Sequence, residues 1–499
     1  MTVENSMYSA CFMVHTNIND RNRELITLPD NFDLDRHIIQ YPPELHGFRS
    51  KLMFNKEKAY HFLGLISSII SRSPDVVLKD GFTPIFQKKV RDSIKDIKQY
   101  IDYLINTGVI VSNGTYIVGK QSLGYKWSQQ YSLRRFSVKD ILCRYKDYDN
   151  QQYKYQFTQY PYLFHWYQQN KLMIDDTAAE EYAWLVYQDK MNDLSKESWD
   201  INTVTGEKKH PESQYKSALL SIAKIKYQHY EAHIDNNVHR LHSAFTGIGK
   251  KYRKFVSYDG QKLVGIDVTN SQPYIVSLIL NKEFWNIFSF NSSLPFNFKS
   301  LYPMMQTRLM SIETIKMIED YFNNVEENAF LDYKKLVSSG RFYENIIEIV
   351  KEHGRTIDRD DAKILIFYTI YSSNKLPQDP FLRQMRDIFK NMFPQVEELF
   401  KIIKHEFKSI KEDEEYSSIF GRQHNRLACL LQHIESEILL HKCCKRIWEE
   451  GNQQIPVFTI HDNIVTTVGN EDFVANIMTE ELTKYIRLAP TLSLPEYWE

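Results

Sequence analysis

Two aspartates stand where a folded chain would display a carboxylate. Asp267 ends the short apolar run Leu263–Asp267, which predicts a buried strand. Asp462 lies in the sequence His461-Asp462-Asn463, at the tip of a predicted hairpin between two β-rich runs. An aspartate in such a place often does no more than cap a turn. If both strands belong to one sheet, the two carboxylates can meet across it.

A second pattern combines cations with aromatic rings. Arg359, Lys363, Phe367 and Tyr371 are spaced four residues apart in the segment RDDAKILIFYTIY, so they share one slowly drifting face of a predicted helix. Faces of this composition usually stay solvated or pack in a core. Their order and spacing together with the two aspartate motifs favour a functional face instead.

Taken in order, these motifs resemble those of family A DNA polymerases and of the related phage-type single-subunit RNA polymerases. Asp267–Tyr274 (DVTNSQPY) resembles their first palm motif, and Ile460–Val465 (IHDNIV) resembles the third. The segment Arg359–Tyr371 resembles the R-x-x-x-K-x-x-x-F-x-x-x-Y pattern of their fingers helix. The resemblance covers about 238–499, and the ordered set is specific although each motif alone is weak.

Further matches are softer. Gln432 in LLQHIESEILL resembles the Q-G-x-A-x-E segment of the family, with His433 in place of the glycine. The stretch TGIGKKYRKFV resembles the template-contact segment before the first motif, and Glu496–Trp498 resembles the C-terminal end of the family. The nucleic-acid contacts that the resemblance implies are His461, Gln432, Arg253, Arg240 and Thr246.

The resemblance implies nucleotidyl transfer with two divalent ions about 4 Å apart. Asp267, Asp462 and the backbone carbonyl of Val268 would hold them. Magnesium suits these oxygen ligands, with Mn²⁺ as a possible substitute. A third acid often follows the second aspartate in the family, and Asn463 in its place removes one negative charge.

The resemblance also implies a nucleotide site. Arg359 and Lys363 would hold the incoming triphosphate, whereas Phe367 and Tyr371 would stack near the nascent base pair. Tyr274 aligns with the position that screens the 2′ carbon of the sugar, and its alternative role is to pack inside the palm. The expected nucleotide-binding residues are therefore Arg359, Lys363, Phe367, Tyr371, Tyr274 and Gln272.

The elements that must position these residues predict an α+β fold with the architecture of a right-hand polymerase. We expect a palm with an antiparallel sheet at 245–280 and 381–499, and helical fingers at 281–380. A helical thumb at 151–244 is expected to be interrupted by the polar loop Trp199–Ser213.

The remaining residues, 1–150, form an N-terminal region with a winged-helix-like unit at about 85–130. Apolar residues from Ile94 to Ile105 recur at helical spacing on one basic helix that Gly108 ends. The runs Val109–Val111 and Tyr116–Val118 predict a hairpin joined through Asn113-Gly114. Winged helices serve protein contacts as well as DNA binding.

Composition limits the classes of function. Lys and Arg total 62 against 63 Asp and Glu, so a net charge of −1 excludes a globally basic nucleic-acid binder but not a locally basic groove. No run approaches the roughly 18 apolar residues that cross a bilayer, so we expect no membrane partner. Five cysteines without C-x-x-C spacing predict a reducing, cytoplasmic location with neither a zinc site nor disulfides.

The expected function is that of a DNA-dependent DNA polymerase extending a primer, since Phe367 and Gln432 favour that branch of the family. No D-x-E exonuclease start precedes the palm motifs, so proofreading is not expected. The expected partners are DNA template and primer, nucleoside triphosphates, and replication proteins bound through the N-terminal region. A single-subunit RNA polymerase or primase-like enzyme is the first alternative, because two extra residues precede Ser271. An inactive polymerase fold that binds DNA or assembles replication proteins is the second.

Overall fold

Helices and antiparallel sheets build the molecule, as expected for an α+β fold. The structure is a computed structural model that describes residues 23–49, 53–72, 81–117, 122–132, 135–143, 154–201, 208–286, 294–301, 312–326, 328–352, 354–405 and 426–499. Every strand pairing in these ranges is antiparallel. None of the helices within them is long and apolar enough to cross a membrane.

The main sheet carries both aspartate motifs. Its order is β11-β12-β10-β9-β6, and β13 (Glu496–Tyr497) pairs with β10 off this path. Its strands are β6 (Leu172–Ile174), β9 (Val256–Tyr258), β10 (Gln261–Asp267), β11 (Phe458–Ile460) and β12 (Asn463–Thr467). The turn between β9 and β10 is Asp259-Gly260, with φ of 51° and 76°, a pair of left-handed conformations that this dipeptide favours.

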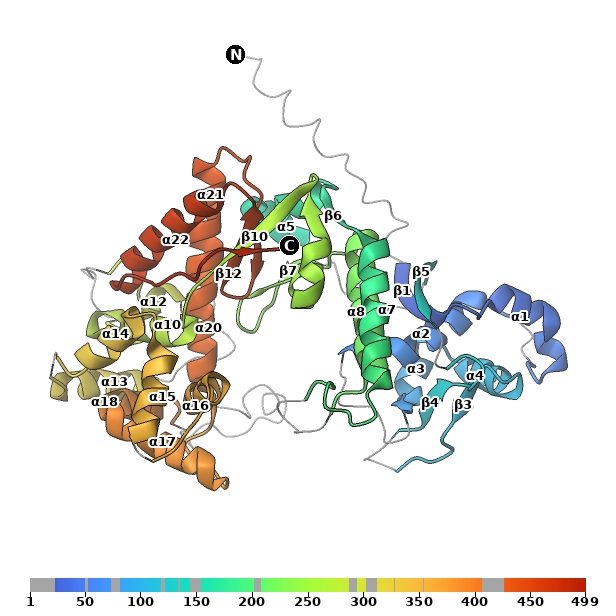
Figure 1. Cartoon of the computed structure of the whole chain (residues 1–499), viewed down its shortest axis with the longest axis horizontal. Helices are drawn as coiled ribbons and strands as arrows, with labels where there is room; N and C mark the ends of the chain where they lie inside the picture. Colours follow the sequence, from blue (N-terminus) through green and yellow to red (C-terminus); the bar gives the residue numbers. More distant parts are fainter. Residues whose placement is uncertain are drawn as a thin grey trace, which may run out of the picture.

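Helices pack against the end of this sheet that carries Asp267. Helix α10 (Ser271–Ile279) is buried along its whole length, because its sequence SQPYIVSLI offers no charged face to solvent. It contacts α22 (Glu471–Ile486) and α20 (Arg426–Ile438). Helix α20 continues through the π-helical segment η7 (Leu439–Cys444) into α21 (Lys445–Glu450). The start of α10 therefore lies between the end of β10 and the side of α20 (Figure 1).

A helical block follows α10. Its helices are α11 (Lys282–Trp285), α12 (Phe298–Leu301), α13 (Ile312–Asn324), α14 (Leu331–Ser338), α15 (Phe342–Glu352), α16 (Arg359–Tyr371), α17 (Pro380–Met392) and α18 (Pro394–Ile403). Lys404, at the end of α18, donates a hydrogen bond to the carbonyl of Thr369 in α16. Arg386 of α17 donates to the carbonyl of Lys375 at 3.0 Å. The block thus extends to Ile403, beyond the expected boundary at 380.

The region expected to form a thumb divides in two. The two long helices are α7 (Asp176–Asn192) and α8 (Pro211–Lys226). Helix α8 begins within the expected polar loop Trp199–Ser213, and residues 202–207 of that loop lie outside the described ones. The first part packs on the main sheet instead. It comprises α5 (Lys154–Gln159), α6 (Pro161–Gln168) and β6, which pairs with β9. The Tyr162 hydroxyl lies 2.7 Å from Nδ1 of His441, which fixes α6 against η7.

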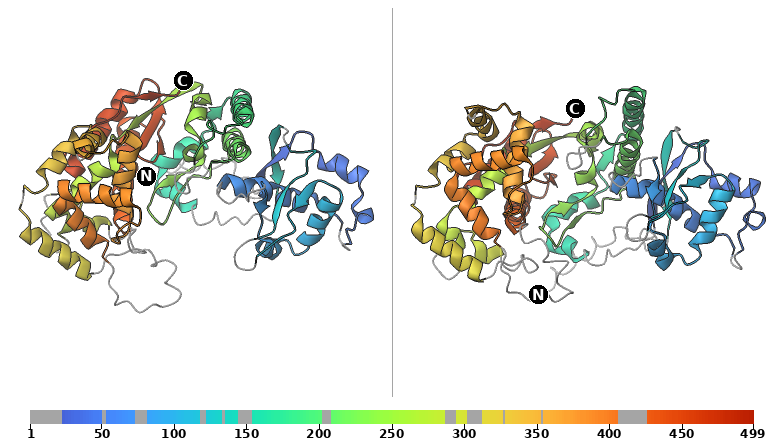
Figure 2. Two further views of the ribbon diagram at one scale, coloured as in Figure 1. Left: turned by 60° about the horizontal axis from the view of Figure 1, so that its bottom comes forward. Right: turned by 90° about the horizontal axis from the view of Figure 1, so that it is seen from below.

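The N-terminal unit lies at one end of the molecule, beyond α7 and α8 (Figure 2). Its elements are β1 (Arg23–Pro29), α1 (Leu34–Gln40), η2 (Pro43–Leu45), α2 (Lys56–Arg72), β2 (Thr83–Pro84), α3 (Gln87–Ser93), α4 (Ile97–Asn106), β3 (Ile110–Ser112), β4 (Gly124–Trp127) and β5 (Phe136–Leu142). Strands β2, β4 and β3 form one sheet in that order, and β1 pairs with β5. The helix expected over Ile94–Ile105 is α4, which begins at Ile97, whereas Ile94 lies at the C-cap of the preceding helix α3.

Gly108 ends α4 as predicted. Its φ is 73°, and its N–H donates to the carbonyl of Ile105. The N–H of Val109 donates to the carbonyl of Leu104. The predicted hairpin partner is wrong, however. Strand β3 pairs with β4, and Tyr116 and Ile117 are exposed; Val118 lies outside the described residues. The buried rings of Tyr125 and Trp127 explain why β4 is the preferred partner.

Candidate active site

The two aspartates lie at the same end of neighbouring strands. Strands β10 and β12 pair with Asp267 opposite Asn463, and β11 joins β12 through the two-residue turn His461-Asp462. His461 has a φ of 57°, a left-handed conformation that lets the turn close between these strands. The sheet register therefore brings together the two carboxylates that the sequence places 195 residues apart.

Electrostatics show that the two carboxylates form one site. Burial raises the pKa of Asp267, and the negative charge of Asp462 raises it further. Burial likewise raises the pKa of Asp462. Oδ1 of Asp267 is buried and has no hydrogen-bond partner among the described residues. A buried carboxylate oxygen without a partner, beside a second acid, suits a divalent cation that would offset both charges.

The backbone around Val268 leaves its expected role intact. An isolated antiparallel bridge joins Val268 to Leu492. On one side of it, Ser493 N–H donates to the Asp267 carbonyl at 2.9 Å. On the other side, Thr269 N–H donates to the Thr491 carbonyl, also at 2.9 Å. Neither bond uses the carbonyl of Val268. The role of that carbonyl as a metal ligand stays a prediction.

Asn463 fills the space that a side chain at position 265 would take. A Cβ added to Gly265 would come within 2.6 Å of Oδ1 of Asn463. Oδ1 of Asn463 is buried without a hydrogen-bond partner among the described residues. Glycine at 265 is therefore what allows the amide to lie flat on the sheet beside Asp267.

Glu435 of α20 is a site residue that the sequence motifs did not reveal. Its side chain is almost fully buried, and Oε1 accepts a hydrogen bond from Arg240. Oε2 accepts from Gln272, and from Oγ of Ser271 at 3.3 Å. Because each of its oxygens has a protein donor, Glu435 serves to position these side chains, in contrast to Asp267. Its only signal in the sequence is the three-residue spacing from Gln432 on one helix face.

Glu435→Gln is expected to destabilise the chain by about 1–3 kcal/mol, because the partly buried guanidinium of Arg240 loses its carboxylate partner. Denaturant unfolding measures this. The double variant Glu435→Gln with Arg240→Gln should lose less stability than the sum of the two single variants. The matched control Glu449→Gln, in an exposed pair with Lys445, should change stability by less than about 0.5 kcal/mol. Strict additivity of the two single effects would contradict the pairing.

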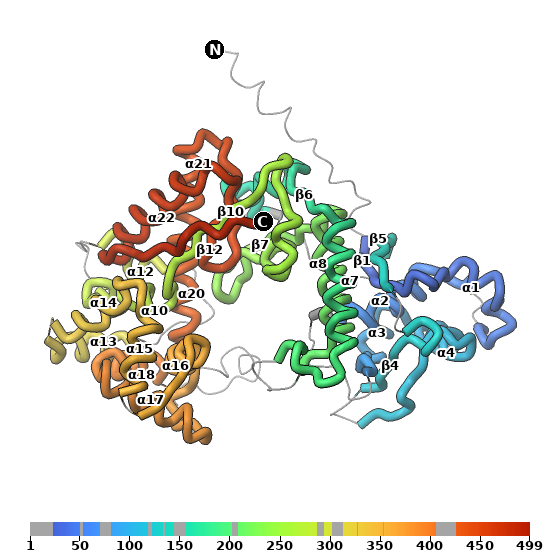
Figure 3. Tube along the Cα trace, in the orientation of Figure 1, coloured from blue at the N-terminus to red at the C-terminus, as the bar shows by residue number. Residues whose placement is uncertain are grey.

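The aromatic end of α16 reaches this network. The Tyr371 hydroxyl donates to Oε1 of Gln272 at 3.1 Å and is also hydrogen bonded to Gln432. Phe367 stacks on Tyr371 with a centroid distance of 5.6 Å. Gln272, expected to contact nucleotide, instead has both ends of its amide engaged by Tyr371 and Glu435. The structure thus brings α16, α10 and α20 together around the aspartate pair (Figure 3).

The cationic end of α16 is held by exposed ion pairs. Nε of Arg359 lies 2.9 Å from Oε1 of Glu344, and Nζ of Lys363 lies 3.1 Å from Oδ1 of Asp360. The guanidinium of Arg359 also lies over the Tyr343 ring, 5.4 Å from its centre. Burial and the charge of Asp462 raise the pKa of Tyr343 to about 12, although Arg359 opposes this shift. Tyr343, another residue that the motifs missed, therefore connects Arg359 with the aspartate site.

Tyr274 packs in the core rather than facing a sugar. Its side chain is 1% exposed, and its hydroxyl donates to the carbonyl of Leu488 at 2.7 Å. A ring enclosed in this way offers no surface to a ribose. The structure therefore corrects the interpretation as a sugar gate and supports the packing alternative.

The expected nucleic-acid contacts differ in their surroundings. His461 lies beside Asp462 with part of its ring exposed, and the partial loss of water around the ring, together with the charge of Arg240, lowers its pKa. Arg253 lies over the Trp498 ring, 5.5 Å from its centre, and within the field of Asp267. The Thr246 hydroxyl is used in the cap of α9 (Ala244–Gly247), where it accepts from Ser243 N–H at 3.1 Å.

No family model and no curated protein matches this chain. Among solved structures, the chain is similar to the POL domain of Pol1 from M. smegmatis in complex with DNA primer-template and dNTP, with a TM-score of 0.29 and 12% sequence identity. The alignment covers 67% of this chain and 69% of that chain. Similarity at this level carries no inference about function, which must come from the site residues themselves.

Proposed function

We propose that the chain is a template-directed nucleotidyltransferase, and most simply a DNA polymerase that extends a primer. One observation carries the proposal. The carboxylates of Asp267 and Asp462 meet at one end of the main sheet, and the basic and aromatic face of α16 reaches the same place through Tyr371 and Gln272. Acids for metal ions, cations for phosphates and rings for bases are the three components that such a reaction needs.

In this proposal Asp267 and Asp462 would hold two divalent cations, Mg²⁺ with Mn²⁺ as a substitute, which would supply Lewis-acid chemistry at the primer 3′ hydroxyl and at the leaving pyrophosphate. The 3′ oxygen attacks the α-phosphorus, a new P–O bond forms, and the bond to pyrophosphate breaks. Lys363 and Arg359 donate to the triphosphate. Their present partners Asp360 and Glu344 are partly exposed, and such pairs contribute little, so a triphosphate can replace them.

The architecture supports this assignment. We propose that the main sheet with α10, α20 and α22 is a palm, that the block from α11 to α18 is the fingers, and that α7 and α8 are the thumb. The N-terminal unit runs α2-β2-α3-α4-β3-β4 along the chain, and its sheet order β2-β4-β3 supports the proposal that it is a winged helix. Exposed cations on α3, on α4 and in the turn between them favour contact with DNA over contact with a replication protein. They are Lys88, Lys89, Arg91, Lys95 and Lys98.

Incorporation of labelled nucleotides tests the function directly. The purified chain would be given dNTPs or NTPs, with primed or unprimed templates, and with Mg²⁺, Mn²⁺ or chelator. We expect template-dependent extension of the primer with dNTPs, lost in chelator. A preference for NTPs, or synthesis without a primer, would replace the DNA polymerase proposal with the RNA polymerase or primase alternative. DNA binding without incorporation under any condition would support the inactive alternative.

A further inference from the structure

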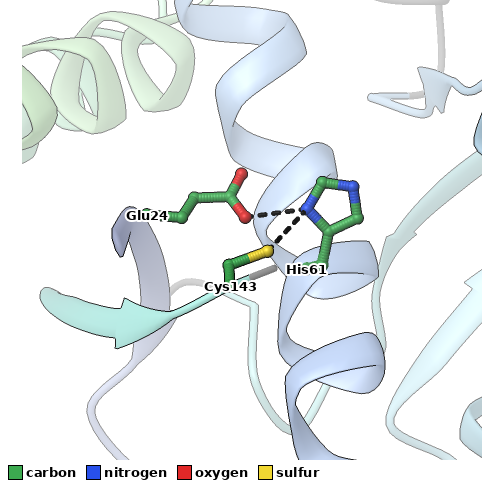
Figure 4. A group of neighbouring side chains, drawn as sticks. All are labelled: Glu24, His61 and Cys143. Carbon is green, nitrogen blue, oxygen red and sulfur yellow. Dashed lines mark hydrogen bonds and ion pairs between the residues drawn. The ribbon is translucent and has the colours of Figure 1, made fainter. Parts of the chain in front are cut away.

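Three potential metal ligands converge far from the aspartate pair, in the N-terminal unit. Nδ1 of His61 lies 2.7 Å from Oε2 of Glu24 and 3.5 Å from Sγ of Cys143 (Figure 4). All three ligand atoms lie within 4.8 Å of one another. Each side chain is buried or nearly so. In the described part of the chain, no other group of three or more His, Cys, Asp or Glu residues meets this distance.

One of the two distances matches a tetrahedral ion. The 2.7 Å between Nδ1 and Oε2 is instead that of a hydrogen bond, which would have to lengthen when an ion replaces the shared proton. With zinc bonds of about 2.3 Å to sulfur and about 2.0 Å to nitrogen, the edge between the two ligand atoms is about 3.5 Å. The observed separation of Sγ and Nδ1 has this value. A simple hydrogen bond needs only the carboxylate at this nitrogen, so the approach of the thiol to the same atom is the feature that points to a cation. Thiolate, imidazole and carboxylate together favour Zn²⁺ over Mg²⁺.

The three ligands come from separate parts of the unit. Glu24 lies on β1, His61 on α2, and Cys143 directly follows β5, which pairs with β1 along its length. An ion bound here would join the helix to the strand pair. Glu24 also lines a cavity of about 230 Å³, bordered by α8 residues such as Ser217 and Ser221 and large enough for water molecules. Of the three ligands, Glu24 is the one that lines this cavity, so its carboxylate faces both His61 and a space that holds water.

We propose that Glu24, His61 and Cys143 form a zinc site that stabilises the N-terminal unit. The cysteine spacing in the sequence indicated no zinc site, because each ligand comes from a different segment and no C-x-x-C pair is involved. The proposed site is independent of the aspartate pair and of the polymerase proposal.

Zinc content of the full chain tests this proposal. The protein would be purified, exchanged into buffer with excess Mg²⁺ to occupy carboxylate sites, and titrated with Zn²⁺ against a chromophoric chelator. We expect one tightly bound Zn²⁺ per chain and a higher Tm with zinc than with chelator. Cys143→Ser and Glu24→Gln should each weaken binding at least about 100-fold, since outer-sphere partners alone change affinity by about 10–100-fold. The control Cys429→Ser, on the buried α20, should keep full zinc affinity.

Cobalt substitution keeps the test decisive if a variant folds poorly. Co²⁺ bound by the unmodified chain should show a thiolate-to-cobalt charge-transfer band, which Asp462→Asn should retain and Cys143→Ser should lose. Absence of that band, less than stoichiometric zinc in the unmodified chain, or equal zinc affinity in Cys143→Ser would overturn the proposal. Each of these results would leave a buried hydrogen bond between His61 and Glu24 with a cysteine beside it.

Discussion

Replacing Asp462 by asparagine is expected to lower nucleotide incorporation by about a thousandfold or more while the chain remains folded. The proposed role of this carboxylate is to hold the cations that stabilise the transferred phosphate, an effect of several kcal/mol on the barrier. Folding should not suffer. Burial and the neighbouring charge raise the pKa of Asp267, so removing one charge relieves repulsion in the folded state. Single-turnover primer extension and thermal unfolding measure the two effects.

Asp267→Asn should behave in the same way. A matched control is Asp259→Asn at the tip of the β9–β10 turn, where the carboxylate pairs with the exposed Lys171 in the same sheet. Asparagine tolerates the left-handed conformation at that turn, so both the fold and the extension rate should be preserved. Near-normal extension by Asp462→Asn would refute the assignment of the aspartate pair.

Lys363→Ala is expected to lower kcat/KM for the nucleotide by about a hundredfold while affinity for primed DNA stays the same. Its ammonium group is proposed to bind the triphosphate through a charge-assisted contact that strengthens in the transition state. Loss of such a contact lowers kcat/KM for the nucleotide. Steady-state kinetics over a range of nucleotide concentration, together with a DNA-binding titration, separate the two quantities.

The block offers a close control for this variant. Lys335 of α14 pairs with Asp332 three residues earlier, just as Lys363 pairs with Asp360, and its side chain is exposed. Lys335→Ala should leave both quantities unchanged. If Lys363→Ala instead lost DNA affinity at an unaltered nucleotide dependence, the α16 face would be a duplex-binding surface.

The sequence predicted those parts of the site that depend on local patterns. The apolar run before Asp267, the hairpin at Asp462 and the four-residue spacing along α16 each follow from the period of a strand or helix. Glu435 escaped notice because its partner Arg240 is 195 residues away, and nothing local marks a long-range pair. Tyr274 was misinterpreted because its position in a motif does not say which way its ring points.

In the N-terminal unit, too, a local sequence pattern did not reveal which strands pair. Asn113-Gly114 is a strong local turn signal, yet β3 pairs with the more distant β4, since burial of Tyr125 and Trp127 outweighs a short turn. Conversely, the end of α4 at Gly108 was predicted correctly, because the requirement for a left-handed residue there is purely local.

The contact between Gly265 and Asn463 has a consequence for how this chain can diverge. Because a Cβ at 265 would collide with the amide oxygen at 463, the two positions cannot enlarge independently. Homologues that carry a side chain at 265 should have a smaller residue than asparagine at 463, whereas those with glutamate at 463 should keep the glycine. The pair should therefore covary in an alignment of relatives, with the size of one residue limiting the size of the other.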